Sequence, residues 1–154
     1  MNIDKRRRIL LQGTAGVGAL AAAGLLAPRQ LLAAWPKDAF TATTYDAAIQ
    51  ARYGAAAAES GEIKITAPEI AENGAVVPVQ VDTGLGDVES ISIFVQNNPR
   101  PLAASFILGK GAGTSVATRI KMGKTSNVVA VVKSGGKLMS AKQEIKVTIG
   151  GCGG

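Results

Sequence analysis

VVAVVKSGG, at residues 128–136, is the stretch of sequence that decides the fold class. Its first five residues, Val128 to Val132, are all apolar, and a run of that length is typical of a strand buried on both faces. Gly135 and Gly136 then separate this run from the next apolar segment, a position in which a Gly-Gly pair predicts a tight β-hairpin. The stretch therefore predicts a central strand and the turn that leads to its neighbour.

On both sides of this stretch, apolar and polar residues alternate as they do in strands with one buried face. The alternating positions are Ile63 and Ile65; Val77, Val79 and Val81; Ile91, Ile93 and Val95; Val116, Thr118, Ile120 and Met122; and Ile145, Val147 and Ile149. Turn-forming residues separate these runs, and no crossover helix fits between them. Residues 61–149 are predicted to form an all-β, immunoglobulin-like antiparallel β-sandwich of about seven strands. Because proline lacks a backbone N–H, Pro78 is expected at a sheet edge or a bulge.

A short helical segment is predicted at residues 35–60, ahead of the strands. Thr43 or Thr44 suits the N-cap of a helix over residues 45–52, and Gly54 suits its end. We expect this helix to be amphipathic and to lie against the β domain.

The first 34 residues have the organisation of a secretory signal peptide. A basic cluster at residues 5–8 precedes an apolar stretch at residues 9–27, and Ala33 and Ala34 offer a cleavage site. A retained membrane anchor is less favoured, because the stretch is rich in glycine and alanine and ends at Pro28.

The arginines within this signal suggest a particular export route. Arg7 and Arg8, followed by Ile9-Leu10-Leu11-Gln12, resemble the twin-arginine export motif, although an Arg6-Arg7 register is also open. The resemblance implies that the protein is folded before it is exported to the periplasm.

The charge balance gives no support for nucleic-acid binding. The chain has 17 basic and 11 acidic residues, of which five and one lie in the first 34 residues. The remaining 12 basic and ten acidic residues leave a net charge of only +2 after cleavage. A mature domain with few aromatic residues and no basic stripe predicts neither a nucleic-acid partner nor a membrane-bound form.

The residue types also limit the chemistry. The chain has no histidine and one cysteine, so Ser–His and Cys–His nucleophiles, histidine-ligated metals and an intrachain disulfide are all excluded. The segment Gly109 to Gly113 lacks the spacing of a phosphate-binding loop. We therefore expect no catalytic residue, no metal site and no cofactor.

The single cysteine lies in a C-terminal glycine-rich segment, Gly150-Gly151-Cys152-Gly153-Gly154. Four glycines leave this arm without side-chain bulk, and five extended residues reach at most about 17 Å. Such an arm suits the delivery of a thiol into a narrow pocket of another protein. We predict that Cys152 is a covalent attachment point for sulfur, since S–S bonds form and exchange at thiols. A structural β module that dimerises through a Cys152 disulfide stays open as the alternative.

These residues resemble a known family. The Gly150–Gly154 motif, the twin-arginine start and the segment from Glu72 to Val79 (ENGAVVPV) are similar to the SoxY subunit of the periplasmic sulfur-oxidation system. The resemblance implies a carrier and not an enzyme, paired with a SoxZ-like subunit. It further implies that a c-type cytochrome loads thiosulfate onto Cys152, that a thiosulfohydrolase releases sulfate, and that a sulfane dehydrogenase acts on the remaining sulfur.

A second class of sulfur carrier also ends in Gly-Gly. Ubiquitin-like carriers are activated by adenylation of the terminal carboxylate, which would be that of Gly154 here. That chemistry needs cytoplasmic ATP and a β-grasp fold with a helix between strands. The export signal and the uninterrupted run of strands both favour the thiol of Cys152 over the carboxylate.

Overall fold

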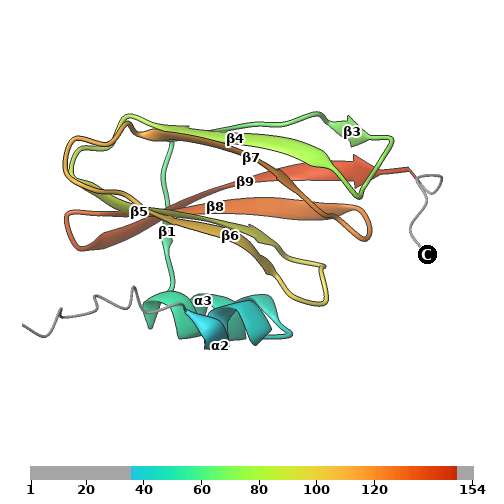
Figure 1. Ribbon diagram of the computed structural model, residues 1–154, viewed down its shortest axis with the longest axis horizontal. Helices are drawn as coiled ribbons and strands as arrows, with labels where there is room; N and C mark the ends of the chain where they lie inside the picture. The colour runs from blue at the N-terminus through green and yellow to red at the C-terminus, as the bar shows by residue number, and fades with distance from the viewer. Residues whose placement is uncertain (1–35, 149–154) are drawn as a thin grey trace, which may run out of the picture. The chain divides into compact units, whose positions relative to one another are not determined.

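The computed structural model describes residues 36–148, and these residues form two short helices followed by nine strands (Figure 1). The elements are α2 (Lys37–Thr41), α3 (Tyr45–Tyr53), β1 (Ala58–Glu59), β2 (Ile63–Thr66), β3 (Ile70–Ala71), β4 (Val77–Thr83), β5 (Val88–Val95), β6 (Leu102–Ile107), β7 (Ser115–Ile120), β8 (Ser126–Ser134) and β9 (Lys137–Val147).

The strands form two sheets that pack face to face (Figure 1). The larger sheet has the order β1-β9-β8-β5-β6, and β3 also pairs with β9; the smaller sheet has the order β2-β4-β7. All the longer strands pair antiparallel, whereas β1 and β3 each pair with β9 in parallel over two residues. The predicted β-sandwich is confirmed. The described residues contain nine strands where seven were predicted, and the two short parallel pairings correct the expectation of purely antiparallel sheets.

Strand β8 runs through the larger sheet and is buried on both faces, as its apolar run predicts. Val128, Ala130 and Val132 face the smaller sheet and pack in one core cluster with valines of β4. Val129 and Val131 face the other way and pack in a second cluster with residues of α3. Since a fully buried valine stabilises a fold by roughly 1.5–3 kcal/mol, this one strand makes a large contribution to stability.

Both helices lie on the outer face of the larger sheet, opposite the smaller one (Figure 1). Helix α3 begins as predicted: Thr44 is its N-cap, the Thr44 Oγ1 accepts a hydrogen bond from the Ala47 N–H, and Gly54 follows its last residue. The Tyr45 ring meets the buried ring of Phe94 edge to face, with centroids 5.6 Å apart. Helix α2 was not predicted, because five residues without a side-chain cap carry no helical period.

Hydroxyl groups connect α3 to the sheet beside this apolar contact. The Tyr53 hydroxyl donates to Ser92 Oγ at 2.8 Å, and the Ser92 and Ser105 hydroxyls are 2.8 Å apart. Arg52 Nε donates to Ser105 Oγ at 3.0 Å. Ser92 is completely buried, and these bonds avoid the cost of about 1–3 kcal/mol for a buried polar group without a partner.

The turn between β8 and β9 is the predicted Gly-Gly hairpin. Gly135 and Gly136 have φ angles of 52° and 76°, which only glycine adopts readily at both positions of a two-residue turn. Glu89 of β5 holds this turn: its Oε1 accepts the Gly136 N–H at 2.9 Å, and its Oε2 lies 2.6 Å from Lys133 Nζ. The hydrogen bond from Lys133, followed by that from Gly136, lowers the pKa of Glu89.

Three segments differ from what the sequence predicted. Pro78 marks neither an edge strand nor a bulge, since β4 lies between β2 and β7 and pairs with both in an unbroken register. It is tolerated there because β2 pairs only with Gln80 to Thr83, so Pro78 lies beyond the last paired residue on that side. Strand β6 was missed because its Ala-Ala-Ser centre does not alternate, and β1 falls inside the segment expected to be helical.

None of the helices within residues 36–148 combines the length and apolar character needed to cross a membrane.

Candidate functional site

The residues predicted to carry the function lie outside residues 36–148. Cys152, its four flanking glycines (Gly150, Gly151, Gly153 and Gly154) and the export residues Arg7 and Arg8 are all in this group, and their roles stay predictions. The last described residue before the glycine-rich arm is Thr148, which directly follows β9. The structure therefore shows the surface from which the arm continues, which we call the arm base (residues 69–76, 121–125 and 146–148).

The backbone N–H groups at the end of β9 donate hydrogen bonds on both sides of the strand. The Lys146 N–H donates to the Glu69 carbonyl at 2.9 Å, and the Thr148 N–H donates to the Ala71 carbonyl at 3.2 Å. On the opposite side, the Val147 N–H donates to Thr125 Oγ1 at 3.0 Å. Three consecutive N–H groups therefore have partners, and the chain is fixed in place up to Thr148.

The turn between β3 and β4 packs tightly against this end of β9. The Gly74 carbonyl accepts the Met122 N–H at 2.7 Å. A Cβ atom at position 74 would collide with the Met122 carbonyl oxygen and would lie 2.9 Å from Val147 Cγ1. Position 74 therefore requires glycine, because the Met122 carbonyl and the Val147 side chain leave no room for a Cβ atom. This turn is the Glu72–Val79 segment that resembles the SoxY family, so the fold brings that segment into contact with the strand that leads to Cys152.

Asparagine side chains connect the neighbouring turns at the same end of the sandwich. Asn98 Nδ2 donates to the Lys121 carbonyl at 2.7 Å, and Asn98 Oδ1 accepts the Gly123 N–H at 3.1 Å. Asn97 Nδ2 donates to the Thr125 carbonyl at 3.1 Å. Because Thr125 also accepts the Val147 N–H, the β5–β6 turn, the β7–β8 turn and the end of β9 form one connected unit.

The arm base carries two exposed apolar side chains. Ile70 is 56% exposed and Val76 is 51% exposed. Ile70 lies opposite Lys146 in the parallel pairing of β3 with β9, and Val76 follows the Gly74 turn, where its N–H donates to the Asn73 carbonyl. Sequence reasoning missed both residues. No pattern could have identified Ile70, since its two-residue strand is defined only by its distant partner.

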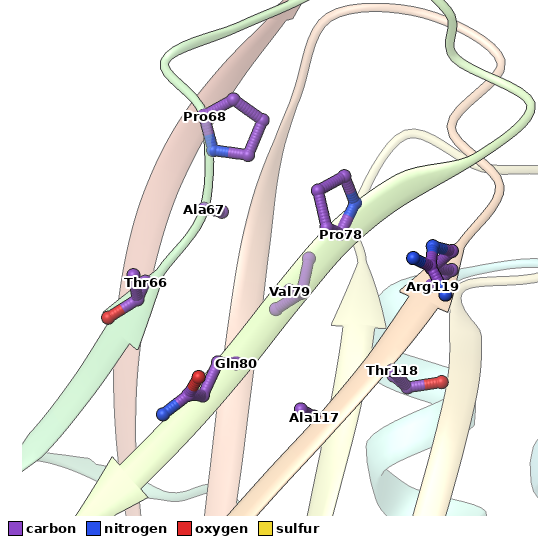
Figure 2. Close-up of a pocket in the computed structure, with 9 residues that line it drawn as sticks. All are labelled: Thr66, Ala67, Pro68, Pro78, Val79, Gln80, Ala117, Thr118 and Arg119. Atoms are coloured by element: carbon purple, nitrogen blue, oxygen red, sulfur yellow. The ribbon is translucent and has the colours of Figure 1, made fainter.

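A separate hollow lies on the outer face of the smaller sheet. It has a volume of about 420 Å³ and is lined by residues 66–68, by residues 78–80 of β4 and by residues 117–119 of β7 (Figure 2). Arg119 is its only ionisable side chain. Among residues 36–148, no group of three or more His, Cys, Asp or Glu side chains is arranged to hold a metal ion.

Solved structures share this fold. The sulfur carrier protein SoxY from Chlorobium limicola f thiosulfatophilum is 48% identical, with a TM-score of 0.61 over 68% of this chain and 96% of that chain. Two variant forms of superoxide reductase (neelaredoxin) from Ignicoccus hospitalis are 22% and 20% identical, each with a TM-score of 0.50. They cover 56% and 69% of this chain and 79% and 90% of their own. At that identity they show a shared fold alone.

The search of curated proteins found no match to this chain. A family model, in contrast, matches most of the chain. The family of the sulfur oxidation protein SoxY matches residues 49–152, a range that begins in α3, spans both sheets and ends at the single cysteine. Together with the 48% identity to a solved SoxY, this match decides the family. The chain belongs to the SoxY family of sulfur oxidation proteins.

Proposed function

We propose that this protein is a periplasmic covalent sulfur carrier that holds thiosulfate-derived intermediates on Cys152 and presents them to partner enzymes. The observation that carries the proposal is the family match, which extends to Cys152, the chain's only cysteine. The similar solved protein is itself named a sulfur carrier. Since the chain contains no histidine, a role as carrier fits its residues better than a role as enzyme.

The proposed loading step is an oxidation. The Cys152 sulfur forms one S–S bond with the terminal sulfur of thiosulfate, and the thiol gives up its proton. Two electrons leave in this step, and a c-type cytochrome partner would accept them one at a time, each reducing one ferric haem to the ferrous state. The product is a cysteine S-thiosulfonate.

The proposed unloading step is a hydrolysis without net electron transfer. A thiosulfohydrolase adds water to the sulfonate sulfur and breaks its bond to the neighbouring sulfur, which releases sulfate and one proton. A protonated persulfide stays on Cys152, where it is the substrate of a sulfane dehydrogenase. In this scheme every bond that forms or breaks belongs to the group carried on Cys152, and the chain needs no cofactor of its own.

Several features support the location and the assembly that we propose. The twin-arginine motif at Arg7 and Arg8 within residues 1–34 fits export of a folded protein to the periplasm. Such export would also allow a SoxZ-like subunit without its own signal to cross as a bound partner. The glycines around Cys152 fit an arm that enters the active-site pockets of several enzymes in turn.

The proposal is tested with Cys152→Ser in the native host grown on thiosulfate. We expect wild-type protein to carry thiosulfate-derived mass that a reductant removes. The serine variant should carry none, should melt like wild type and should support no thiosulfate oxidation. Full thiosulfate oxidation by the serine variant would overturn the proposal. Electrophoresis without reductant tests the alternative, because a protein joined through Cys152 would run as a disulfide dimer.

A further inference from the structure

We propose that Ile70 and Val76 form a contact surface for the proteins that take Cys152 into a pocket. This inference rests on the proposed carrier function and adds a second recognition element beside the arm. Its occupant is the partner enzyme itself, with apolar side chains around the mouth of the pocket that receives the thiol. The argument has three steps: the reach of the arm, the position of the two apolar side chains, and the rigidity of their backbone.

The reach of the arm brings any such partner close to the arm base. Cys152 is four residues beyond Thr148, so its Cα lies within about 14 Å of Thr148 even when the chain is fully extended. Thr148 itself is fixed to Ala71 and lies next to Val147, which is bonded to Thr125. A reactive centre several ångströms below a partner's surface therefore requires that surface to lie against the arm base.

Two of the three exposed large apolar side chains of residues 36–148 belong to the arm base. Among residues 36–148 only three large apolar side chains are exposed: Ile70, Val76 and Ile107. Ile70 is paired with Lys146, and Val76 follows the turn that touches Val147, so both lie beside the last residues of β9. An apolar pair here is covered whenever a partner binds the arm.

Ile107 lies at the opposite end of the larger sheet. It pairs with Ser90, and Ser90 pairs with Lys133, next to the Gly135-Gly136 hairpin. Ser126, at the arm-base end of β8, and Lys133 are seven residues apart along this strand. Because a strand rises about 3.3 Å per residue, Ile107 lies about 23 Å along the sheet from the arm base. Ile107 has the same side chain as Ile70 and is also exposed, and it therefore serves as a matched control.

The backbone that presents the two apolar side chains is already ordered. The Asn73 carbonyl accepts the Val76 N–H, and Asn73 Oδ1 accepts the Ala75 N–H at 2.9 Å. Glu69 and Ala71 on either side of Ile70 accept N–H groups of β9. A surface held in this way loses little conformational entropy on binding, so contact with it adds to affinity more effectively than contact with a loose loop.

The arm base also carries charged side chains. Lys146 lies opposite Ile70, and Lys121 and Lys124 belong to the β7–β8 turn, while Glu69 and Glu72 flank β3 on its two sides. All five are exposed, and an apolar centre inside a polar border is the usual anatomy of a protein–protein contact.

The test compares Ile70→Thr/Val76→Thr with Ile107→Thr in the full-length chain. Threonine keeps the β-branched shape that strands favour and adds a hydroxyl that disfavours apolar contact. The assay follows thiosulfate loading of Cys152 by intact mass, with the purified loading enzyme of the native host and varied concentrations of the carrier. Melting temperature and the rate of Cys152 alkylation by iodoacetamide are measured alongside.

We expect the double variant to melt and to alkylate like wild type while its KM for loading rises about tenfold, equivalent to about 1.4 kcal/mol of binding free energy, with kcat unchanged. Ile107→Thr should load like wild type. Equal loading by the double variant and Ile107→Thr would overturn this inference and leave the carrier function standing. Full activity of Cys152→Ser would instead remove the carrier function itself. If the double variant converts a wild-type dimer to a monomer with unchanged loading, the surface is a contact between copies of this chain and the inference is also overturned.

Discussion

Gly74 and Val147 approach so closely that a Cβ atom on residue 74 would lie 2.9 Å from Val147 Cγ1 and would collide with the Met122 carbonyl oxygen. Two segments far apart in the sequence are thereby matched in shape at the strand that leads to Cys152. The contact makes the arm base sensitive to the smallest possible addition of volume.

Gly74→Ala should therefore destabilise the domain. Overpacking of this kind costs about 1–3 kcal/mol, which exceeds the roughly 0.4–1 kcal/mol that a Gly→Ala change gains from the unfolded chain. Chemical denaturation measures the difference. Gly61→Ala is the control, since nothing lies within 4 Å of its added carbon. Equal stability of the two variants would contradict the close approach.

Val131→Asp and Val129→Asp should be severely destabilising. Val131 is completely buried and Val129 is 4% exposed, both between the larger sheet and α3. An unpaired buried carboxylate costs several kcal/mol, a large share of the roughly 5–15 kcal/mol that stabilises a domain. Ile107→Asp, at a side chain that is 71% exposed, should melt like wild type. Wild-type melting of the Val131 and Val129 variants would show that the helices do not cover this face.

Glu89→Gln should change how stability depends on pH. Because Lys133 and the Gly136 N–H lower the pKa of Glu89 in the folded protein, the ionised carboxylate stabilises the fold at pH values above the ordinary glutamate pKa. That stabilisation is lost as the pH falls through the lowered pKa. The difference in unfolding free energy between wild type and Glu89→Gln should thus be constant near neutral pH and shrink in acid. The same comparison in a Lys133→Met background should show a smaller difference, and a difference independent of pH would contradict this role for Glu89.

Gly151→Val/Gly153→Val should separate the chemistry of the thiol from its delivery. Branched side chains restrict the backbone and add bulk beside Cys152, so the variant should fit poorly into a pocket shaped for glycine. We expect normal alkylation of Cys152 by iodoacetamide and slow loading with thiosulfate by the partner enzymes. Gly151→Ala/Gly153→Ala, with the smallest side chain, should be intermediate. Normal loading of the valine variant would mean that the glycines have no part in delivery.

Arg7→Lys/Arg8→Lys should leave the precursor in the cytoplasm. The charge is kept, but the guanidinium groups that we propose the export machinery recognises are lost. Cell fractionation with immunodetection measures the mature and precursor forms. Arg29→Lys, outside the motif, is the control. Normal maturation of the double variant would argue for the general secretory route.

Local sequence patterns were sufficient for the elements that have a clear period or a clear turn. The apolar run from Val128 to Val132, the Gly135-Gly136 hairpin and the helix capped by Thr44 all lie where the sequence predicted them. Strand β3 could not be predicted in this way. Two residues have no measurable period, and Ile70 becomes part of a sheet only because β9 returns beside it.

In the candidate site too, one part could be predicted from local sequence and another part depends on the tertiary structure. The glycines around Cys152 can be recognised from the sequence without any structure. They indicated the SoxY family, which the family match then confirmed. The exposure of Ile70 and Val76 is a tertiary property, because each side chain would have been assigned to the core from hydrophobicity alone. The sequence therefore identified the attachment residue that we propose and missed the surface beside it.

The hydrogen bonds at the end of β9 also have a mechanical consequence. If partner enzymes take up and release Cys152 as we propose, any pull on the arm would enter the described part of the chain at Thr148. Lys146 and Thr148 donate to the carbonyls of Glu69 and Ala71, and Val147 donates to Thr125. A force along the strand is therefore shared among hydrogen bonds on both of its sides and does not break them one after another. Strand β9 is also the longest strand among residues 36–148 and pairs with β8 from Lys137 to Ile145. Under the proposed carrier function, these bonds would keep the end of the sheet from fraying when the arm is pulled.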